Sequence, residues 1–458
     1  MKRPNILLIM SDEHDPAVTG CYGHPLVQTP NVDRLAAEGT LFENAYCNNP
    51  ICVPSRISFL TGKYASDVNV FDNGSPLASE IPTFAHYLQA SGYETTLCGR
   101  MHMIGPDRLH GFGQRLFDDM NDWVRLGKGP VRTPEARRNS NSHVTECGPG
   151  PPRWLDYDRT VTDLSERFLR HKAGNPSDRP WCLVASFMYP HFPLYAPQEY
   201  LDLYPQDRID LPDLGDELLE SQHPAIRQLR YFFHNDRPLP EELTRTALAS
   251  YFALVTLTDE HIGRLITIVD DSPLLENTVI IYLSDHGEMA GQHGIWQKQC
   301  FYESSVRVPL IVKGPRLEAG ARVNANVSLV DIMPTLLDLA GTPIPGGLRG
   351  RSLLPALRGA ALPDDLVVAE YHAQGMLSAG YMAKKGNLKY NHYVGLPPQL
   401  FDLAADPNEF VNLVGHPGWA DAQSDLHQEL LAKLDPEVVD GRAKRNQQLE
   451  GMARSYAG

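Results

Sequence analysis

Short apolar runs recur along the first two thirds of the chain, and polar or charged residues follow each run. Residues 6–10 are Ile-Leu-Leu-Ile-Met, and Asp12 comes two positions later. Apolar runs of this length predict buried strands. The predicted strands are residues 6–10, 95–99, 181–187 and 278–283. They lead to Asp12, to Arg100 and His102, to His191, and to Asp285 and His286.

Patterns of helical period lie between these runs, at residues 31–38, 82–90, 158–172 and 245–269. Strands that alternate with helices predict an α/β fold in which a large, mostly parallel sheet is sandwiched by helices. Ligands bind such sheets outside the carboxyl ends of the strands. The polar residues that follow the four strands are therefore expected to line one crevice.

The pattern changes near residue 366. Short alternating runs separated by turn-forming residues predict an antiparallel sheet, at residues 367–371, 376–383, 387–393 and 399–403. A helix over 418–434 is expected to pack on this sheet, and residues 440–458 are expected to form a polar helical arm or a frayed tail. We predict two domains, a catalytic α/β domain over residues 1–365 and a smaller α+β domain over 366–458.

Two stretches, residues 104–160 and 200–244, are rich in Pro, Gly, Asp and Arg and show weak periodicity. Long excursions of this kind lie over the crevice, where selectivity is usually determined. Together with the aromatic residues of 187–195, they are expected to form the walls of a partly closed pocket.

The composition narrows the class of protein. The chain has 458 residues with a net charge of −15, which disfavours nucleic acids and anionic membranes as partners. Its seven cysteines are scattered and include no C-x-x-C pair, as expected in a reducing compartment. The first apolar run is too short for a signal peptide, and no stretch reaches the length of a membrane span. These features predict a cytoplasmic protein without a membrane partner.

The stretch Cys52-Val-Pro-Ser-Arg56 carries the most specific chemistry. Pro54 suits a first helical turn and Gly62 a helix end, so Cys52 is expected beside a helix N-terminus, which favours an anion. Arg56, one turn further, offers a planar guanidinium that suits a tetrahedral oxyanion. The alternative is that Cys52 is an ordinary small buried residue.

A second group of residues suits a metal ion. Asp12, Asp285 and His286 offer two carboxylates and an imidazole to one divalent cation, and Glu13 is a further candidate. Oxygen ligands suit Ca²⁺, and the nitrogen shifts the choice towards Mn²⁺ or Mg²⁺. The alternative is that aspartates at strand ends cap the helices that follow.

Single polar residues elsewhere have ordinary alternatives. Asn73 lies in the turn sequence Asp-Asn-Gly, and a turn is the first interpretation of it. Arg100 and His102 alternate at a strand end, so that their side chains share one face. His191 and Lys298 stand beside aromatic residues, and either could be a structural or a solvated side chain.

Taken together, these motifs resemble the type I, formylglycine-dependent sulfatases of the alkaline phosphatase superfamily. Besides the Cys52 motif, the resemblance rests on residues 20–23 (GCYG), 29–36 (TPNVDRLA), 42–46 (FENAY), 61–62 (TG), 284–287 (SDHG), 303–309 (ESSVRVP), 397–403 (PPQLFDL) and 406–409 (DPNE). Residues 72–112 are most similar to the choline-sulfatase-like branch. Many members have a lysine where Arg100 stands, an Asp at Glu13 and an Asn at His286.

The resemblance implies an alkaline-phosphatase-like fold and a formylglycine that a separate formylglycine-generating enzyme, or an equivalent maturase, makes from Cys52. It implies one divalent metal bound by Asp12, Asp285, His286 and residue 52. The positions that match sulfate-contacting or acid–base residues of the family are Asn73, Arg56, Arg100, His102, His191 and Lys298. The implied activity is hydrolysis of sulfate esters. The mixed Arg, Asp and aromatic content of the two excursions and the net charge of −15 favour a small sulfate monoester over a polyanionic polymer.

The implied reaction begins with attack of the hydrated aldehyde on sulfur. His191 or Lys298 would protonate the leaving alkoxide, and His102 would take the proton that regenerates the aldehyde. Two other functions stay open at this point: a phosphonate monoester or phosphodiester hydrolase with the same centre, and a non-catalytic relative. Whether the chain forms a homo-oligomer is also left open.

Overall fold

The computed structural model of the protein describes residues 2–120, 132–212, 214 and 221–457. Within these residues nine strands form the central sheet, and eight of them follow the order β11-β2-β10-β8-β1-β6-β3-β4, with β9 paired to β2. The strands are β1 (Asn5–Asp12), β2 (Thr40–Tyr46), β3 (Glu94–Gly99), β4 (Gln114–Phe117), β6 (Trp181–Pro190), β8 (Thr278–Ser284), β9 (Arg307–Val308), β10 (Leu310–Lys313) and β11 (Ala321–Ser328).

The middle of the sheet is parallel. Strand β1 pairs in parallel with β6 on one side and β8 on the other, with Leu7 opposite Leu183 and Ile280. Strand β3 continues this arrangement beyond β6, whereas β10 runs antiparallel between β8 and β2. The sheet is therefore mixed and mostly parallel, as predicted, and the carboxyl ends of β8, β1, β6 and β3 lie at one edge.

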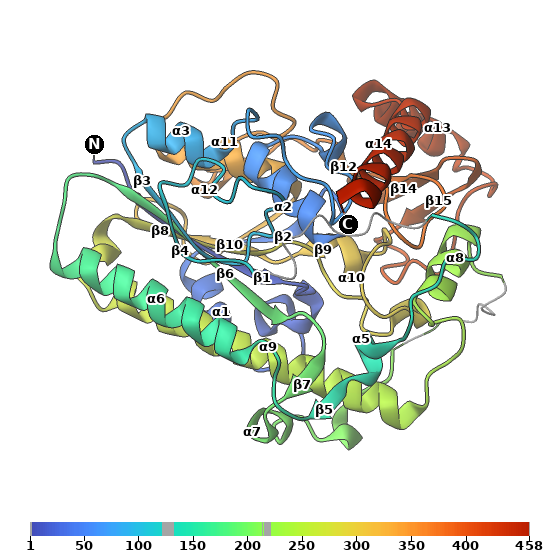
Figure 1. The fold of residues 1–458 in the computed structure, drawn as a ribbon, viewed down its shortest axis with the longest axis horizontal. Helices are drawn as coiled ribbons and strands as arrows, with labels where there is room; N and C mark the ends of the chain where they lie inside the picture. Colours follow the sequence, from blue (N-terminus) through green and yellow to red (C-terminus); the bar gives the residue numbers. More distant parts are fainter. Residues whose placement is uncertain (1, 121–131, 213, 215–220, 458) are drawn as a thin grey trace.

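Helices cover both faces of this sheet (Figure 1). On one side lie α1 (Pro30–Glu38), α6 (Leu155–Gly174) and α9 (Glu241–Asp270), and on the other α2 (Cys52–Thr61), α3 (Phe84–Ala90), α11 (Ile332–Leu339) and α12 (Leu354–Leu357). Alternate residues of β1 supply the two cores, since Leu8 packs with the α2 side and Leu7 with the α9 side. The four helices predicted by periodicity are confirmed.

The smaller antiparallel sheet is also confirmed. It contains β12 (Val367–Tyr371), β13 (Gly380–Lys385), β14 (Leu388–Tyr393) and β15 (Leu396–Asp402) in sequence order. Leu426 and Leu430 of α13 (Ala420–Lys433) pack on it. Because Ala369 of β12 joins the core of the large sheet, the two parts pack closely. The domain boundary after residue 365 stays a prediction.

The polar C-terminal segment forms a helical arm rather than a frayed tail through Ala457, and Gly458 lies outside the described residues. Helix α14 (Pro436–Ala457) crosses towards α2 (Figure 1). The side-chain amide of Gln447 donates to Asp72 Oδ2 over 3.1 Å, and Arg442 donates to the carbonyl of Ser66. The arm therefore supports the turn that carries Asn73.

The two aperiodic stretches contain more regular structure than expected. Their described residues include β4, α5 (Ser142–Thr145), β5 (Cys147–Pro149), the first turns of α6, α7 (Gln198–Leu201), α8 (Pro224–Phe232) and the start of α9. The prediction that all of 104–160 lies over the crevice is wrong for β4, which is an edge strand of the central sheet. Residues 121–131, 213 and 215–220 of these stretches lie outside the described residues.

All seven cysteines are unpaired. Among the described residues, every helix is too short or too polar to traverse a lipid bilayer.

Candidate active site

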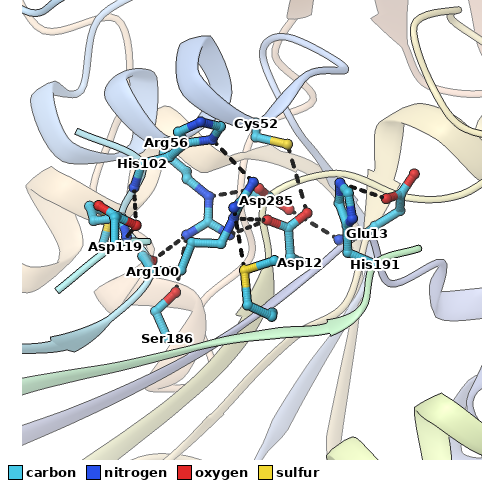
Figure 2. A network of polar contacts seen from close by, with 12 residues as sticks. Asp12, Glu13, Cys52, Arg56, Arg100, His102, Asp119, Ser186, His191 and Asp285 are labelled. Atoms are coloured by element: carbon cyan, nitrogen blue, oxygen red, sulfur yellow. Dashed lines mark hydrogen bonds and ion pairs between the residues drawn. The ribbon is translucent and has the colours of Figure 1, made fainter. Parts of the chain in front are cut away.

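The residues predicted at the strand ends meet at one place. Asp12 ends β1, Arg100 follows β3, His191 follows β6 and Asp285 follows β8. These strands are neighbours in the sheet, so their carboxyl ends bring the side chains within contact of one another (Figure 2). The convergence expected from the sequence is confirmed.

Cys52 lies above this cluster at the start of a buried helix. It is the first residue of α2, which ends at Gly62 with a φ of 63°. The side-chain oxygen of Asn73 accepts a hydrogen bond from the Val53 amide over 2.9 Å, so the predicted turn also holds the start of α2. Burial raises the pKa of the Cys52 thiol to about 12. Without a bound metal, an unmodified thiol in this position is therefore protonated at neutral pH.

Four predicted ligands form one compact group. Single ligand atoms of Asp12, Cys52, Asp285 and His286 lie within 4.8 Å of one another, and all four residues are buried. Cys52 Sγ is 3.2 Å from His286 Nε2 and 3.8 Å from Asp12 Oδ1. Two carboxylates, an imidazole and a fourth side chain are a donor set that suits a divalent cation.

The surroundings of the group orient its ligand atoms. The Nδ1 of His286 donates to the Gly287 carbonyl over 3.0 Å, which leaves the lone pair of a neutral ring on Nε2, facing the group. Asp285 Oδ1 accepts the backbone amides of Glu13 and His286. Outer contacts of this kind fix ligand tautomer and direction in metal sites. The residues present thus fit the metal that the resemblance implies.

Arg56 reaches back as predicted, but its guanidinium contacts the carboxylates instead of the cavity. It donates from Nε to Asp285 over 2.7 Å and from NH2 to Asp12 over 2.9 Å. Its NH1 donates to the Arg100 carbonyl and to Ser186 Oγ, and the side chain is fully buried. Because every nitrogen of the guanidinium already has an acceptor, Arg56 organises the two carboxylates rather than facing a ligand.

Arg100 links the ligand group to the cavity. Its Nε donates to Asp12, and its NH2 donates to His102 Nδ1 over 3.1 Å. Burial opposes ionisation of Asp12, but Arg100 and Arg56 outweigh it and hold the pKa of Asp12 well below its usual range. Since an arginine only donates, His102 Nδ1 is the acceptor, and the neutral ring carries its proton on Nε2.

Glu13, His191 and Lys298 form a third contact group. Lys298 Nζ lies 2.7 Å and His191 Nε2 lies 3.3 Å from Glu13 Oε2. Burial disfavours the charged form of Lys298, but Glu13 outweighs it and raises the pKa of Lys298. Asp12, Glu13 and His191 also form a second compact ligand group. Glu13 therefore has a lysine partner besides its place beside the predicted metal ligands.

A cavity of about 530 Å³ opens onto these residues. Six predicted residues line it: Cys52, Asn73, Arg100, His102, His191 and Lys298. The walls add Arg138, Ser142, Glu146, Arg153 and Trp154 from the first excursion and Phe232 and Phe233 from the second. The prediction that both excursions form the pocket walls is therefore confirmed for these described residues. Another cavity, of about 370 Å³, is lined by other residues, among them Glu303, Arg307 and Lys384.

Several residues that shape the site were missed in the sequence. Asp119 accepts the amides of Met101, His102 and Met103, and thereby holds His102 at a φ of 56°. In the same way, Asp158 accepts the amides of Met188 and Tyr189, which precede His191. Neither aspartate lies in a motif, and each contacts amides 16 to 31 positions away.

The fold and the site define a class of enzyme. The family model described as Sulfatase matches residues 4–342, and the model described as N-sulphoglucosamine sulphohydrolase, C-terminal, matches residues 291–435. The chain belongs to the sulfatase family.

Individual relatives agree with this assignment. The chain is 33% identical to a choline-sulfatase of Rhizobium meliloti, over 97% of this chain and 90% of that protein. It is 30% identical to arylsulfatase K of Bos taurus, over 94% and 82%. A solved structure of a phosphonate monoester hydrolase from Silicibacter pomeroyi superposes with a TM-score of 0.77 at 25% identity, covering 94% of this chain and 95% of that one.

Proposed function

We propose that this sulfatase hydrolyses small sulfate monoesters in the cavity above Cys52. The observation that carries the proposal is the position of Cys52 Sγ, which lies at the start of α2 within 4.8 Å of ligand atoms from Asp12, Asp285 and His286. Arg100, His102 and Lys298 line the same cavity. The position of the nucleophile, the proposed metal ligands and the cationic groups therefore lie together at one place.

Two groups complete this centre in the proposal. A divalent metal, Mn²⁺, Mg²⁺ or Ca²⁺, held by Asp12, Asp285, His286 and residue 52, would supply Lewis-acid chemistry. Formylglycine made from Cys52 would supply the hydroxyl nucleophile that a thiol cannot provide. Burial of all four ligand side chains supports this assignment, because a bound cation compensates carboxylates that water does not reach.

The remaining roles follow from the directions of the side chains. Arg100 and Lys298 face the cavity and would neutralise the charge that develops on the transferred group. Arg56 would hold Asp12 and Asp285 in place from behind. Asn73 would donate its amide nitrogen to the bound oxyanion, since its oxygen is used by Val53.

Lys298 is better placed than His191 to protonate the leaving alcohol. The Nδ1 of His191 donates to the Phe192 carbonyl over 2.7 Å, and its Nε2 lies 3.3 Å from Glu13 Oε2, so both ring nitrogens already face protein oxygens. Lys298 carries N–H protons at the cavity wall. His102 would accept a proton only after Arg100 NH2 turns from Nδ1 to the oxyanion, because that contact now occupies the ring lone pair.

The test compares substrates and maturation together. The enzyme used is one in which the mass of the Cys52 peptide shows loss of sulfur. Its kcat/KM is expected to be higher for 4-nitrophenyl sulfate than for the matched phenylphosphonate ester. The Cys52→Ala variant is expected to fold normally and to have no activity. A clear preference for the phosphonate would instead assign the activity that is named for the Silicibacter structure. Absence of the modification in active enzyme would contradict the formylglycine proposal.

The proposal includes a setting for the protein. Seven unpaired cysteines and the absence of a membrane-spanning helix among the described residues support a cytoplasmic location, where a formylglycine-generating enzyme or an equivalent maturase would act on Cys52. Fractionation of the source cells with an antibody to this chain tests the location.

A further inference from the structure

The cavity is cationic although the chain is acidic. Its charged lining residues are Arg100, Arg138, Arg153, Lys298 and Glu146, whereas the net charge of the whole chain is −15. Asp12 contacts Arg100 and Glu13 contacts Lys298, so these two cations belong to the reaction centre. Arg138 and Arg153 lie further out. The cavity therefore holds positive charge beyond what the metal ligands use.

Arg138 is the better placed of the two outer arginines. It is half-buried, and its guanidinium lies 5.8 Å from the centre of the Phe192 ring and 5.5 Å from that of Phe233. Across the described part of the chain, no carboxylate forms an ion pair with it and no acceptor forms a hydrogen bond with its guanidinium. A partly buried guanidinium without an acceptor is costly. A group that is absent from the chain would remove this cost.

The backbone around Arg138 is fixed to the second excursion. Its amide donates to the carbonyl of Phe232 over 2.9 Å, and its carbonyl accepts from His234 Nε2 over 2.6 Å. The preceding residue, Arg137, instead pairs with Asp236 and lies over Tyr231. The chain therefore directs two adjacent arginines to different environments, one with a carboxylate and one in the cavity.

Arg138 lies near the ring that also contacts Lys298, the proposed proton donor to the leaving group. Lys298 Nζ lies 5.2 Å from the centre of the same Phe192 ring, and the His191 ring stacks on Phe192 at 4.1 Å between centres. The proposed proton donor and the Arg138 guanidinium therefore both lie near this one ring. A ligand whose sulfate lies beside Lys298 would bring its alcohol portion near the ring and within reach of Arg138.

We propose that the alcohol portion of the substrate carries a second anionic group, a carboxylate or another sulfate, and that Arg138 binds it. This inference rests on the proposed sulfate ester hydrolysis and specifies its substrate class. Arg153, whose guanidinium lies over Trp154 at 4.5 Å, adds positive charge to the same cavity. An alcohol that carries a quaternary ammonium group, such as choline, would meet an unpaired cation at this position and is disfavoured.

The experiment uses matched substrates with the matured enzyme. The probes are derivatives of 4-nitrophenyl sulfate that carry a carboxylate, a sulfonate, a neutral carboxamide or a trimethylammonium group beside the nitro group. The expected ratio of kcat/KM for carboxylate over carboxamide is on the order of tenfold, the value for one charge-assisted hydrogen bond. Comparison of the sulfonate with the carboxylate derivative shows whether the second anionic group is sulfate-like or a carboxylate. The trimethylammonium ester is expected to be the poorest substrate.

Two variants assign the preference to one residue. Arg138→Met removes the charge but keeps an unbranched side chain between the rings, and it is expected to bring the carboxylate-to-carboxamide ratio close to one. Arg137→Met removes the same formal charge from a residue outside the cavity lining, and it is expected to keep the wild-type ratio. Equal ratios in wild type and Arg138→Met would overturn the proposal, and so would loss of the preference in Arg137→Met.

A binding measurement separates this inference from the proposed function. Calorimetric Kd values of the same esters for Cys52→Ala, which cannot turn them over, give the preference without catalysis. Tighter binding of the carboxylate ester than of the carboxamide supports the role of Arg138 even if hydrolysis of all sulfate esters fails. Turnover of 4-nitrophenyl sulfate together with equal binding of the two esters would refute the second anion site and leave the sulfatase proposal intact.

Discussion

Replacing Arg56 with methionine tests the electrostatic organisation of the site. The guanidinium is fully buried and bridges Asp12 and Asp285. Asp12 keeps Arg100 as a partner in the Arg56→Met variant, whereas Asp285 loses its guanidinium. Removing one member of a buried ion pair costs about 3–5 kcal/mol, because it leaves an uncompensated charge in the interior. We expect a loss of unfolding free energy in this range.

The loss can be expressed as a shift in melting temperature. Unfolding entropy is about 2.1 cal/mol/K per residue, so a chain of 458 residues that unfolds as one unit gains roughly 1 kcal/mol per kelvin. The expected decrease in Tm for Arg56→Met is therefore about 3–5 °C in the presence of a chelator. Adding a divalent cation is expected to reduce the difference from wild type, because the bound ion compensates both carboxylates.

Arg264 provides a matched control. It also bridges two carboxylates, Asp163 and Glu166, each over 2.8 Å, but its side chain is 42% exposed. Surface pairs contribute about 0–1 kcal/mol, so Arg264→Met is expected to lower Tm by about 1 °C or less, whether or not metal is present. Differential scanning calorimetry of both variants decides the matter. Equal, small shifts would refute the view that Arg56 holds the two carboxylates together.

Three further predictions address the reaction. Arg100→Lys keeps the charge but loses the planar guanidinium that contacts Asp12 and the cavity at once, and a loss of about 1–3 kcal/mol in kcat/KM is expected; full activity would mean that only charge matters. Asp285→Asn and His286→Ala should each lower the metal content measured by elemental analysis, and full occupancy in both would remove them from the ligand group. Lys298→Met should lower the turnover of alkyl sulfates more than that of activated aryl sulfates, because poor leaving groups need a proton. An equal loss for both classes would mean that Lys298 is not the proton donor, and His191→Ala would then be expected to show the larger loss for alkyl sulfates.

The central strands were predictable from the sequence because burial on both faces gives them continuous apolar runs. Residues 6–10 and 278–283 belong to β1 and β8, which lie side by side in the middle of the sheet. The edge strand β11 alternates Ala, Val and Ala with Arg and Asn, since part of it is exposed, and it has no continuous apolar run. Strand β10 is too short to distinguish from a loop, and its antiparallel direction has no local signature.

The residues of the site also fall into those that the sequence predicts and those that it does not. Residues that follow buried strands could be predicted, because topology alone brings the carboxyl ends together. The role proposed for Cys52 rests on a motif resemblance, since a lone cysteine at a helix start has no distinctive pattern. Asp119, Asp158 and Arg138 could not be found in the sequence, because their partners come from segments far along the chain. For Arg56 the direction was predictable, but a guanidinium suits a carboxylate and an oxyanion equally, so its target was not.

The two buried arginines, Arg56 and Arg100, both bind Asp12 but differ in their other contacts. Every nitrogen of the Arg56 guanidinium donates to a protein acceptor, so its proposed contribution to the reaction is to fix the positions of Asp12 and Asp285. Arg100 donates to Asp12 through Nε and to His102 through NH2, and its side chain also lines the cavity. Because both hold the same carboxylate, movement of Arg100 towards a bound oxyanion, as proposed, would change the environment of Asp12, a proposed metal ligand. Substrate binding and metal binding are for this reason expected to be coupled through Asp12, with each strengthened by the other.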